Sequence, residues 1–346
     1  MLTQIKIGSE CVYKRMIIIG AILAICLFII ILFIVSPKPT AILIHRLFEG
    51  GVAVKPYNYD EIEKMVHIEK DLSYNSQYKK GHLDIIKPKE FEGYLPVIFW
   101  VHGGAFLGGD KSDITEYAVQ IASKGYIVVN INYDLAPSSK YPTPLYQIKE
   151  AYQFIEKNAE SYGIDMSRLY FAGDSAGAQI ISQFVNVHVD KDYANLVKIE
   201  RVVSSDNIKG VLLFCGPYDV SKLSNNSDRF LINFLFKRVG WAYIGERDWT
   251  NSQKVKEASI LDHISSNFPP TFITDGNIGS FEDQGKDLAN KLKDYGVEVS
   301  QVFYSEEEAE LGHEYQFMMN TPQAENTFNK VVEFLSHTNN KVNIGS

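Results

Sequence analysis

Cysteine is scarce in this 346-residue sequence, which has only Cys11, Cys26 and Cys215. None of the three forms a CxxC pair or a cysteine–histidine cluster with the spacing of zinc ligands, so a disulfide framework and a structural zinc site are excluded. A basic excess is also lacking, because 42 Asp and Glu outnumber 34 Lys and Arg, with a net charge of -8. Nucleic-acid binding normally shows as a basic excess or stripe, and we therefore expect no nucleic-acid partner.

Glycine and proline are not abundant either, with 24 and 12 residues, while 45% of the chain is hydrophobic. This composition excludes collagen-like, low-complexity and disordered chains. We expect a folded protein whose length allows one large domain or two ordinary ones.

A long apolar run is present. Residues 16–35 read MIIIGAILAICLFIIILFIV, with no charge over twenty positions. At about 1.5 Å per residue this run spans roughly the 30 Å hydrocarbon core of a bilayer. A cleaved signal peptide is the competing interpretation, but its apolar region is usually about 7–15 residues long and ends in small residues. A lipoprotein modified at Cys26 is a weaker alternative, because the thiol lies inside the apolar run.

The charges around this run predict its orientation. Lys6, Lys14 and Arg15 precede it with one acid, Glu10, whereas only Lys38 follows closely. The positive-inside rule then predicts a single-pass protein of the cell membrane, with residues 1–15 as a cytoplasmic head and the rest of the chain outside. The lipid bilayer is accordingly an expected partner, through residues 16–35.

Beyond a polar tether and lead-in at 36–80, short apolar runs alternate with amphipathic stretches, which is typical of parallel strands joined by helices. We predict one doubly wound, mostly parallel α/β domain at 81–338. The expected strands are 82–88, 97–102, 126–133, 169–174, 210–216, 271–276 and 299–304. The expected helices are 112–124, 143–160, 176–188, 280–295 and 321–337. The segment 217–268 is too long for an ordinary connection and rich in aromatic residues, which predicts an inserted helical cap.

The strongest local pattern is Gly173-Asp174-Ser175-Ala176-Gly177, between an expected strand and an expected helix. Gly-x-Ser-x-Gly in this context is the nucleophile elbow, a tight strained turn that exposes the serine at the end of the sheet. Ser175 is therefore the predicted nucleophile. The amides at the start of the following helix favour a developing oxyanion.

A second pattern, His102-Gly103-Gly104-Ala105-Phe106, follows the strand VIFWV. Consecutive glycines allow backbone N–H groups to face a cavity without intruding side chains, as an oxyanion hole requires. Both patterns end strands of one parallel sheet, so they meet at its carboxyl edge. We predict that Gly103, Gly104 and Ala176 donate the oxyanion-hole hydrogen bonds.

HGGAF, NINYDLAP, YPTPLYQ and GDSAG, in this order, resemble the esterase/lipase family of α/β-hydrolases related to hormone-sensitive lipase. The resemblance covers roughly residues 82–337 and implies a serine carboxylester hydrolase with its triad in the order Ser, acid, His. It implies His313, in the loop after the last strand, as the general base, rather than His188, His263 or His337.

The acid is the triad member at which this sequence departs from the family pattern. The family pattern expects an Asp nine residues past the second proline of Pro269-Pro270, where this chain has Gly279. Asp275, at the carboxyl end of the strand, is our first choice. Asp219, after the preceding strand, is the alternative, and Glu282 or Asp283 fits a solvated helix face better.

Three functions follow from this pattern. The first is a membrane-anchored serine esterase that acts on small to medium acyl or acetyl esters through an acyl-enzyme. The second is a peptide or amide hydrolase of the same fold, and the third is a non-catalytic binding module, which the missing acid at Gly279 would explain. The resemblance implies a small-molecule ester as substrate. No metal, nucleotide or flavin pattern occurs in the sequence, so we expect no cofactor.

Overall fold

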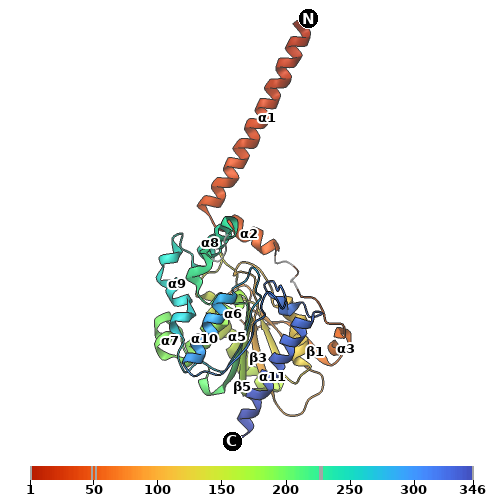
Figure 1. Cartoon of the computed structure of the whole chain (residues 1–346), viewed down its shortest axis with the longest axis vertical. Helices are drawn as coiled ribbons and strands as arrows, with labels where there is room; N and C mark the ends of the chain where they lie inside the picture. Colours follow the sequence, from red (N-terminus) through yellow and green to blue (C-terminus); the bar gives the residue numbers. More distant parts are fainter. Residues whose placement is uncertain (1, 48–49, 51–52, 226–228, 345–346) are drawn as a thin grey trace.

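The computed structural model describes residues 2–47, 50, 53–225 and 229–344. Helix α1 (Leu2–Val35) projects away from the rest of the chain, and the C-terminus lies at the opposite end (Figure 1). Within α1, Tyr13–Val35 is long and apolar enough to cross a membrane, and the domain buries none of it. The predicted apolar helix at 16–35 is therefore continuous with a helical head.

An eight-stranded sheet forms the centre of the domain, in the order β1-β2-β4-β3-β5-β6-β7-β8. The pairs β1–β2 and β2–β4 are antiparallel, and every other neighbouring pair is parallel. The strands are β1 (Val66–Ser73), β2 (His82–Pro88), β3 (Leu95–Val101), β4 (Ile127–Ile131), β5 (Ile164–Asp174), β6 (Ile208–Phe214), β7 (Thr271–Thr274) and β8 (Val299–Val302). The prediction of a mostly parallel, doubly wound sheet is confirmed.

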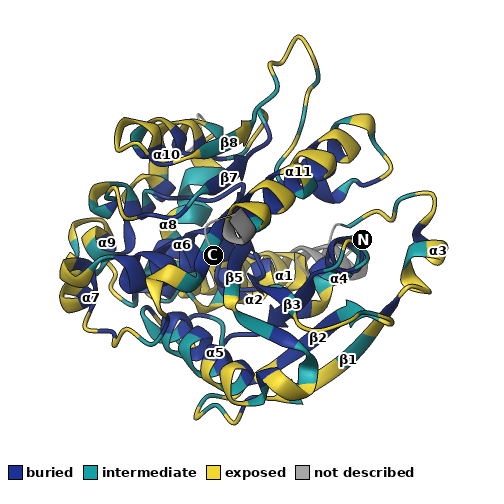
Figure 2. Ribbon diagram, turned by 90° about the horizontal axis from the view of Figure 1, so that it is seen from below, coloured by how far each residue is buried: buried dark blue, intermediate teal, exposed yellow. Residues whose placement is uncertain are grey.

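Helices cover both faces of this sheet, because its central strands are apolar on both sides. Phe99 points into one core and Trp100 into the other, as the alternation along a strand requires. Helices α4 (Thr115–Ala122) and α11 (Pro322–Ile344) cover one face; α5 (Thr143–Tyr162), α6 (Ala176–Val189) and α10 (Glu282–Asp294) cover the other. The central strands are buried between these two layers, whereas the edge strands β1 and β8 are mostly intermediate or exposed (Figure 2). A short helix that the sequence analysis missed, α7 (Lys191–Val197), follows α6.

The segment between β6 and β7 is helical, as expected for a cap. It contains α8 (Phe230–Ile244), α9 (Gln253–Ala258) and the short 3-10 turns Val220–Asn225, Trp249–Asn251 and Ile260–His263. Helix α8 is apolar on nearly all sides. Its C-terminal half packs into the domain, and Phe236 and Val239 line the cavity beside Ser175. The cap therefore lies over the site described below.

The segment 36–80, expected to be a tether and lead-in, contains two helices and one strand. Helix α2 (Lys38–Leu47) packs on α8, α3 (Tyr59–Glu63) follows, and β1 pairs with β2 at the edge of the sheet. The sequence pattern missed β1 because VHIEKDLS alternates weakly and carries four charged or titratable side chains on an exposed edge.

Candidate active site

Ser175 lies at the sharp turn between β5 and α6 with φ 50° and ψ -120°, a left-handed conformation that strains any residue with a side chain. Its flanking glycines are required by packing. A Cβ on Gly177 would lie 2.0 Å from the Val101 carbonyl oxygen, and one on Gly173 would lie 2.5 Å from the backbone of Gly177. The amide of Ser175 donates to the Phe214 carbonyl at 2.7 Å, which fixes the turn against β6. This is the geometry expected of a nucleophile elbow.

His313 reaches Ser175 from the loop after β8. Its Nε2 lies 2.9 Å from Ser175 Oγ, a hydrogen-bond distance between the predicted base and the predicted nucleophile. Burial lowers the pKa of His313 to about 4, although 27% of its side-chain surface still faces the cavity. The imidazole is therefore neutral at physiological pH and able to accept a proton.

The group on the other ring nitrogen of His313 is a hydroxyl, not a carboxylate. Ser280 Oγ lies 2.6 Å from His313 Nδ1 and donates a hydrogen bond to Asp275 Oδ1. Asp275, 1% exposed at the end of β7, thus reaches His313 only through Ser280. The sequence analysis missed Ser280 because the family pattern directs attention to a carboxylate at the preceding position, Gly279.

The alternative acids lie elsewhere. Asp219 accepts hydrogen bonds from the amide and hydroxyl of Ser221, two residues on. Glu282 forms an ion pair with Lys286 at 2.9 Å on α10, and Asp283 is exposed on the same helix, as expected of a solvated face. None of these contacts involves His313.

One predicted oxyanion donor needs correction. The amide of Gly103 donates to Asp174 Oδ2 at 2.7 Å, so it is already engaged in the structure. Gly104, Ala105 and Phe106 follow with φ of 105°, 52° and 63°, a left-handed run that turns the next amides away from the strand. Within the described ranges, the amides of Gly104, Ala105 and Ala176 have no protein acceptor. Ala105, which lines the cavity beside Ser175 and Ala176, thus replaces Gly103 as the candidate donor.

Two buried carboxyl groups, those of Asp174 and Glu314, lie beside the loop that begins at Gly103. Asp174 accepts from the Trp100 indole at 2.8 Å as well as from Gly103, and its carboxyl shares a hydrogen bond with that of Glu314. Burial raises the pKa of Asp174 to about 6, and burial together with the Asp174 charge raises the pKa of Glu314 well above its ordinary value. We expect one ionised and one protonated carboxyl, with Glu314 as the protonated partner.

The cavity above Ser175 has a volume of about 110 Å³. Its walls are mostly apolar: Phe236 and Val239 come from the cap helix α8, and Phe281 stands edge-on to the His313 ring with the centroids 5.6 Å apart. The remaining lining residues are Ala105, Phe106, Ser175, Ala176, Pro217, Leu223, Gly279 and His313. Such a cavity suits a small acyl group.

Cys215 lies below the same site, and its thiol, Asp275 and His313 offer ligand atoms within 4.8 Å of one another. Burial raises the pKa of the Cys215 thiol well above its ordinary range, whereas a metal ligand must be a thiolate. The thiol accepts from the Glu314 amide at 3.3 Å, and His313 Nδ1 is engaged by Ser280. The chemistry of these three groups therefore fits a metal ion poorly.

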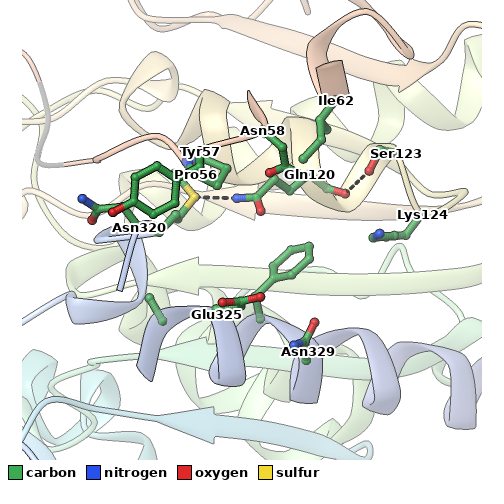
Figure 3. A pocket seen from close by; sticks show the side chains of 13 residues that line it. Pro56, Tyr57, Asn58, Ile62, Gln120, Ser123, Lys124, Asn320, Glu325 and Asn329 are labelled. Carbon is green, nitrogen blue, oxygen red and sulfur yellow. Dashed lines mark hydrogen bonds between the residues drawn. The ribbon is translucent and has the colours of Figure 1, made fainter. Parts of the chain in front are cut away.

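A larger cavity of about 370 Å³ lies between α3, α4 and α11 (Figure 3). Among the lining residues, Gln120 Nε2 donates to Met319 Sδ at 2.6 Å, and Ser123 Oγ donates to the Gln120 carbonyl at 2.7 Å. Lys124 and Glu325 also line it, but none of the residues of the Ser175 site does.

Comparison with known proteins identifies the class. Residues 83–292 match the BD-FAE family model. The probable carboxylic ester hydrolase LipM of Mycobacterium tuberculosis is 25% identical over 241 residues, 68% of this chain and 54% of that protein. The putative alpha/beta hydrolase R526 of Acanthamoeba polyphaga mimivirus is 23% identical over 256 residues, 70% of this chain and 67% of that protein. The match thus spans about half of LipM and about two thirds of R526.

Among solved structures, esterase B from Lactobacillus rhamnosis superposes with a TM-score of 0.71 at 19% identity, covering 85% of this chain and 90% of that one. That likeness establishes the fold. Fold, motifs and relatives define an α/β-hydrolase of the carboxylesterase type related to hormone-sensitive lipase. The chain belongs to the BD-FAE family.

Proposed function

We propose that this protein is a serine carboxylester hydrolase that acts on small to medium acyl esters through an acyl-enzyme. The observation that carries the proposal is the 2.9 Å contact between Ser175 Oγ and His313 Nε2 at the floor of a mostly apolar cavity. The relatives described above as an ester hydrolase and an esterase support the same reaction class.

In the first half-reaction, His313 takes the proton of Ser175 while Oγ attacks the ester carbonyl, and the tetrahedral oxyanion is bound by backbone N–H groups. Gly104, Ala105 and Ala176 are our candidate donors for this hole. His313 then gives its proton to the departing alcohol, leaving Ser175 acylated. Water, deprotonated by the same imidazole, releases the acid in the second half-reaction.

Asp275 and Ser280 together take the part of the third triad member. An ionised Asp275 accepts from the Ser280 hydroxyl, and the oxygen of Ser280 can then accept from His313 Nδ1–H. This arrangement leaves the lone pair on Nε2, the tautomer that a general base requires. Burial raises the pKa of Asp275 to about 7, so this carboxyl ionises at a pH close to the physiological range.

A peptide or amide hydrolase would use the same groups. The small cavity of about 110 Å³ favours esters, because an extended peptide needs a long binding groove.

The binding-module alternative depended on the missing acid at Gly279. Ser280, which is hydrogen-bonded to Asp275, lies within hydrogen-bond distance of His313 Nδ1, and this partner for the base supports catalysis over the binding module.

We also propose that α1 is an uncleaved single-pass anchor, with the N-terminus in the cytoplasm and the hydrolase domain outside. The span Tyr13–Val35 is long and apolar enough to cross a membrane, and Lys6, Lys14 and Arg15 precede its uncharged run at 16–35, which supports this topology.

The test uses the full-length protein in detergent micelles. We expect turnover of p-nitrophenyl acetate and labelling by a fluorophosphonate probe, both lost in Ser175→Ala. Equal turnover by the parent and the variant would disprove the serine mechanism. Faster cleavage of aminopeptide substrates than of esters at the same enzyme concentration would favour the amidase instead.

A further inference from the structure

We propose that the outer faces of α2 and of the first half of α8 rest on the membrane surface, and that the site takes short-chain acyl esters of apolar alcohols from the bilayer. The proposal rests on the function proposed above, in particular on α1 as an anchor.

Large apolar side chains are unusually exposed on these two helices. Phe230 and Leu231 at the start of α8 expose 84% and 65% of their surface, and Leu47 and Ile42 on α2 expose 72% and 57%. Leu43 on α2 is also exposed, at 44%. Contiguous exposed apolar side chains mark protein or membrane contacts, because water disfavours them.

The inner face of α2 is already occupied. Thr40, Ala41 and Ile44 are buried against the domain, where α2 packs on α8. With a helical period of 3.6 residues, Ile42 and Arg46 fall one turn apart on the side opposite Ile44. Helix α2 is thus apolar towards the domain and, at Ile42, also away from it, which is the pattern of a helix lying between a protein and a lipid surface.

The anchor α1 places the outer face of α2 close to the membrane. Helix α1 ends at Val35, and α2 begins at Lys38. Ser36, Pro37 and Lys38, at the junction of α1 and α2, line a small cavity with Trp241 and Gly245, so this junction lies beside the C-terminal end of α8. Both α2 and α8 lie directly at the base of α1 (Figure 1). A bilayer crossed by α1 therefore has its surface beside α2 and α8.

The charge of the two helices fits a lipid surface. The 25 residues of α2 and α8 include Lys38, Arg46, Lys237 and Arg238 but no Asp or Glu. The chain as a whole is acidic, at -8. The Arg238 guanidinium lies over the rings of Phe234 and Trp241, 5.0 and 5.1 Å from their centroids. Basic and aromatic side chains beside exposed aliphatic ones are typical of the membrane interface, and the cations suit anionic headgroups.

Helix α8 links this surface to the chemistry. Its first residues, Phe230 and Leu231, are exposed, and about one and a half to two and a half turns later Phe236 and Val239 line the catalytic cavity. In this arrangement, an ester dissolved in the outer leaflet reaches Ser175 along α8. The small cavity takes a short acyl chain, while the apolar alcohol extends along α8 towards the lipid.

The first experiment measures contact with lipid and does not depend on catalysis. The full-length protein, with Cys11→Ser and Cys26→Ser, is labelled with an environment-sensitive NBD fluorophore at Leu231→Cys, Ile42→Cys or, as control, Tyr295→Cys. Tyr295 is 46% exposed at the end of α10. In vesicles of equal parts phosphatidylcholine and phosphatidylglycerol, spin-labelled lipid should quench the first two labels and not the third. Labels at 231 and 42 that are as unquenched as the label at 295 would overturn the proposal.

The second experiment compares two esters in the same vesicles: bilayer-dissolved hexadecyl acetate and water-soluble p-nitrophenyl acetate. Ile42→Glu with Leu231→Glu should lower turnover of hexadecyl acetate by about fivefold or more, because charge weakens the contact with lipid. It should leave p-nitrophenyl acetate turnover unchanged, and Tyr295→Glu should alter neither. Equal effects of the double variant on both esters would overturn the proposed route. Flotation with vesicles tests the anchor separately, and turnover of p-nitrophenyl acetate by the parent tests the esterase.

Discussion

Ser280 Oγ lies 2.6 Å from His313 Nδ1, at the position where a serine hydrolase usually has its carboxylate. Because Ser280 also donates to Asp275, it couples a buried acid to the base through one hydroxyl. The hydroxyl can donate and accept at once, so the state of Asp275 determines which ring nitrogen of His313 carries the proton. The Asp275 charge, which would stabilise an imidazolium at His313, is also further from the ring than in a direct Asp–His pair, because the Ser280 hydroxyl lies between them.

Ser280→Ala should therefore lower kcat by about 10²–10⁴-fold with little change in KM, since the losses measured for an uncoupled triad acid reach this range. Ser280→Thr keeps the hydroxyl and should recover most of the rate. Steady-state kinetics on p-nitrophenyl acetate provide the measurement. An alanine variant within twofold of the parent would show that Ser280 does not position His313.

The pH dependence should follow Asp275 rather than His313. Below pH 7 the Asp275 carboxyl is protonated and donates to Ser280, which then donates to His313 Nδ1 and leaves the proton on Nε2, where it blocks the base. As pH rises through the pKa of about 7, Asp275 ionises and the active tautomer forms. We expect kcat/KM to rise with pH around 7. The ionisation of His313, with its pKa of about 4, should give a separate rise in the pH–rate profile at lower pH.

Asp275→Asn is the control for this assignment. It should lower the rate and remove the limb near pH 7. It should also stabilise the fold at high pH relative to the parent. A carboxyl whose folded pKa lies above its ordinary 3.8 adds stability at low pH that is lost as pH rises through the folded value. A limb near 7 that persists in Asp275→Asn would refute the assignment.

The elements of the fold could be predicted from the sequence because strands such as VLLFC are buried on both faces and the glycines around Ser175 are required sterically. The edge strand β1 could not, since half-exposed strands with charged residues carry little periodicity. Helix α2 could not be predicted for another reason. Only Thr40, Ala41 and Ile44 are buried, which is too short a pattern to recognise in the sequence without knowing that α2 packs on α8.

Within the site, Ser175 and His313 could be predicted from motif and chain order, but the hydrogen-bond partners could not. The engagement of Gly103 by Asp174 depends on residues 71 positions apart, which no local pattern encodes. Ser280 is chemically ordinary in the sequence. Its position between Asp275 and His313 arises from the turn after β7, where Gly279 has a φ of 63°.

Asp174 should prove to be a structural residue rather than a catalytic one. Asp174→Ala leaves the Trp100 indole and the Gly103 amide without their acceptor, at a cost of about 1–3 kcal/mol for each buried donor. We expect a loss of about 2–5 kcal/mol in the free energy of unfolding. Chemical denaturation of the full-length protein in micelles measures it. Glu333→Ala, at an exposed ion pair with Lys330, is the control and should change stability by less than about 1 kcal/mol. Equal stability of the two variants would contradict the buried network.

The acyl specificity should depend on Phe236, which reaches the cavity from the cap. Phe236→Ala removes a ring from the wall, so a longer acyl chain gains room and an acetyl group loses contacts. The ratio of kcat/KM for p-nitrophenyl hexanoate to that for p-nitrophenyl acetate should rise by about tenfold, the scale of one or a few methylenes in an apolar pocket. Phe230→Ala is the matched control, because it changes the same residue type on the same helix at a side chain that is 84% exposed and outside the cavity. Its ratio should equal that of the parent, and a similar rise in both variants would mean that general loosening of α8, not the wall at Phe236, sets the acyl length.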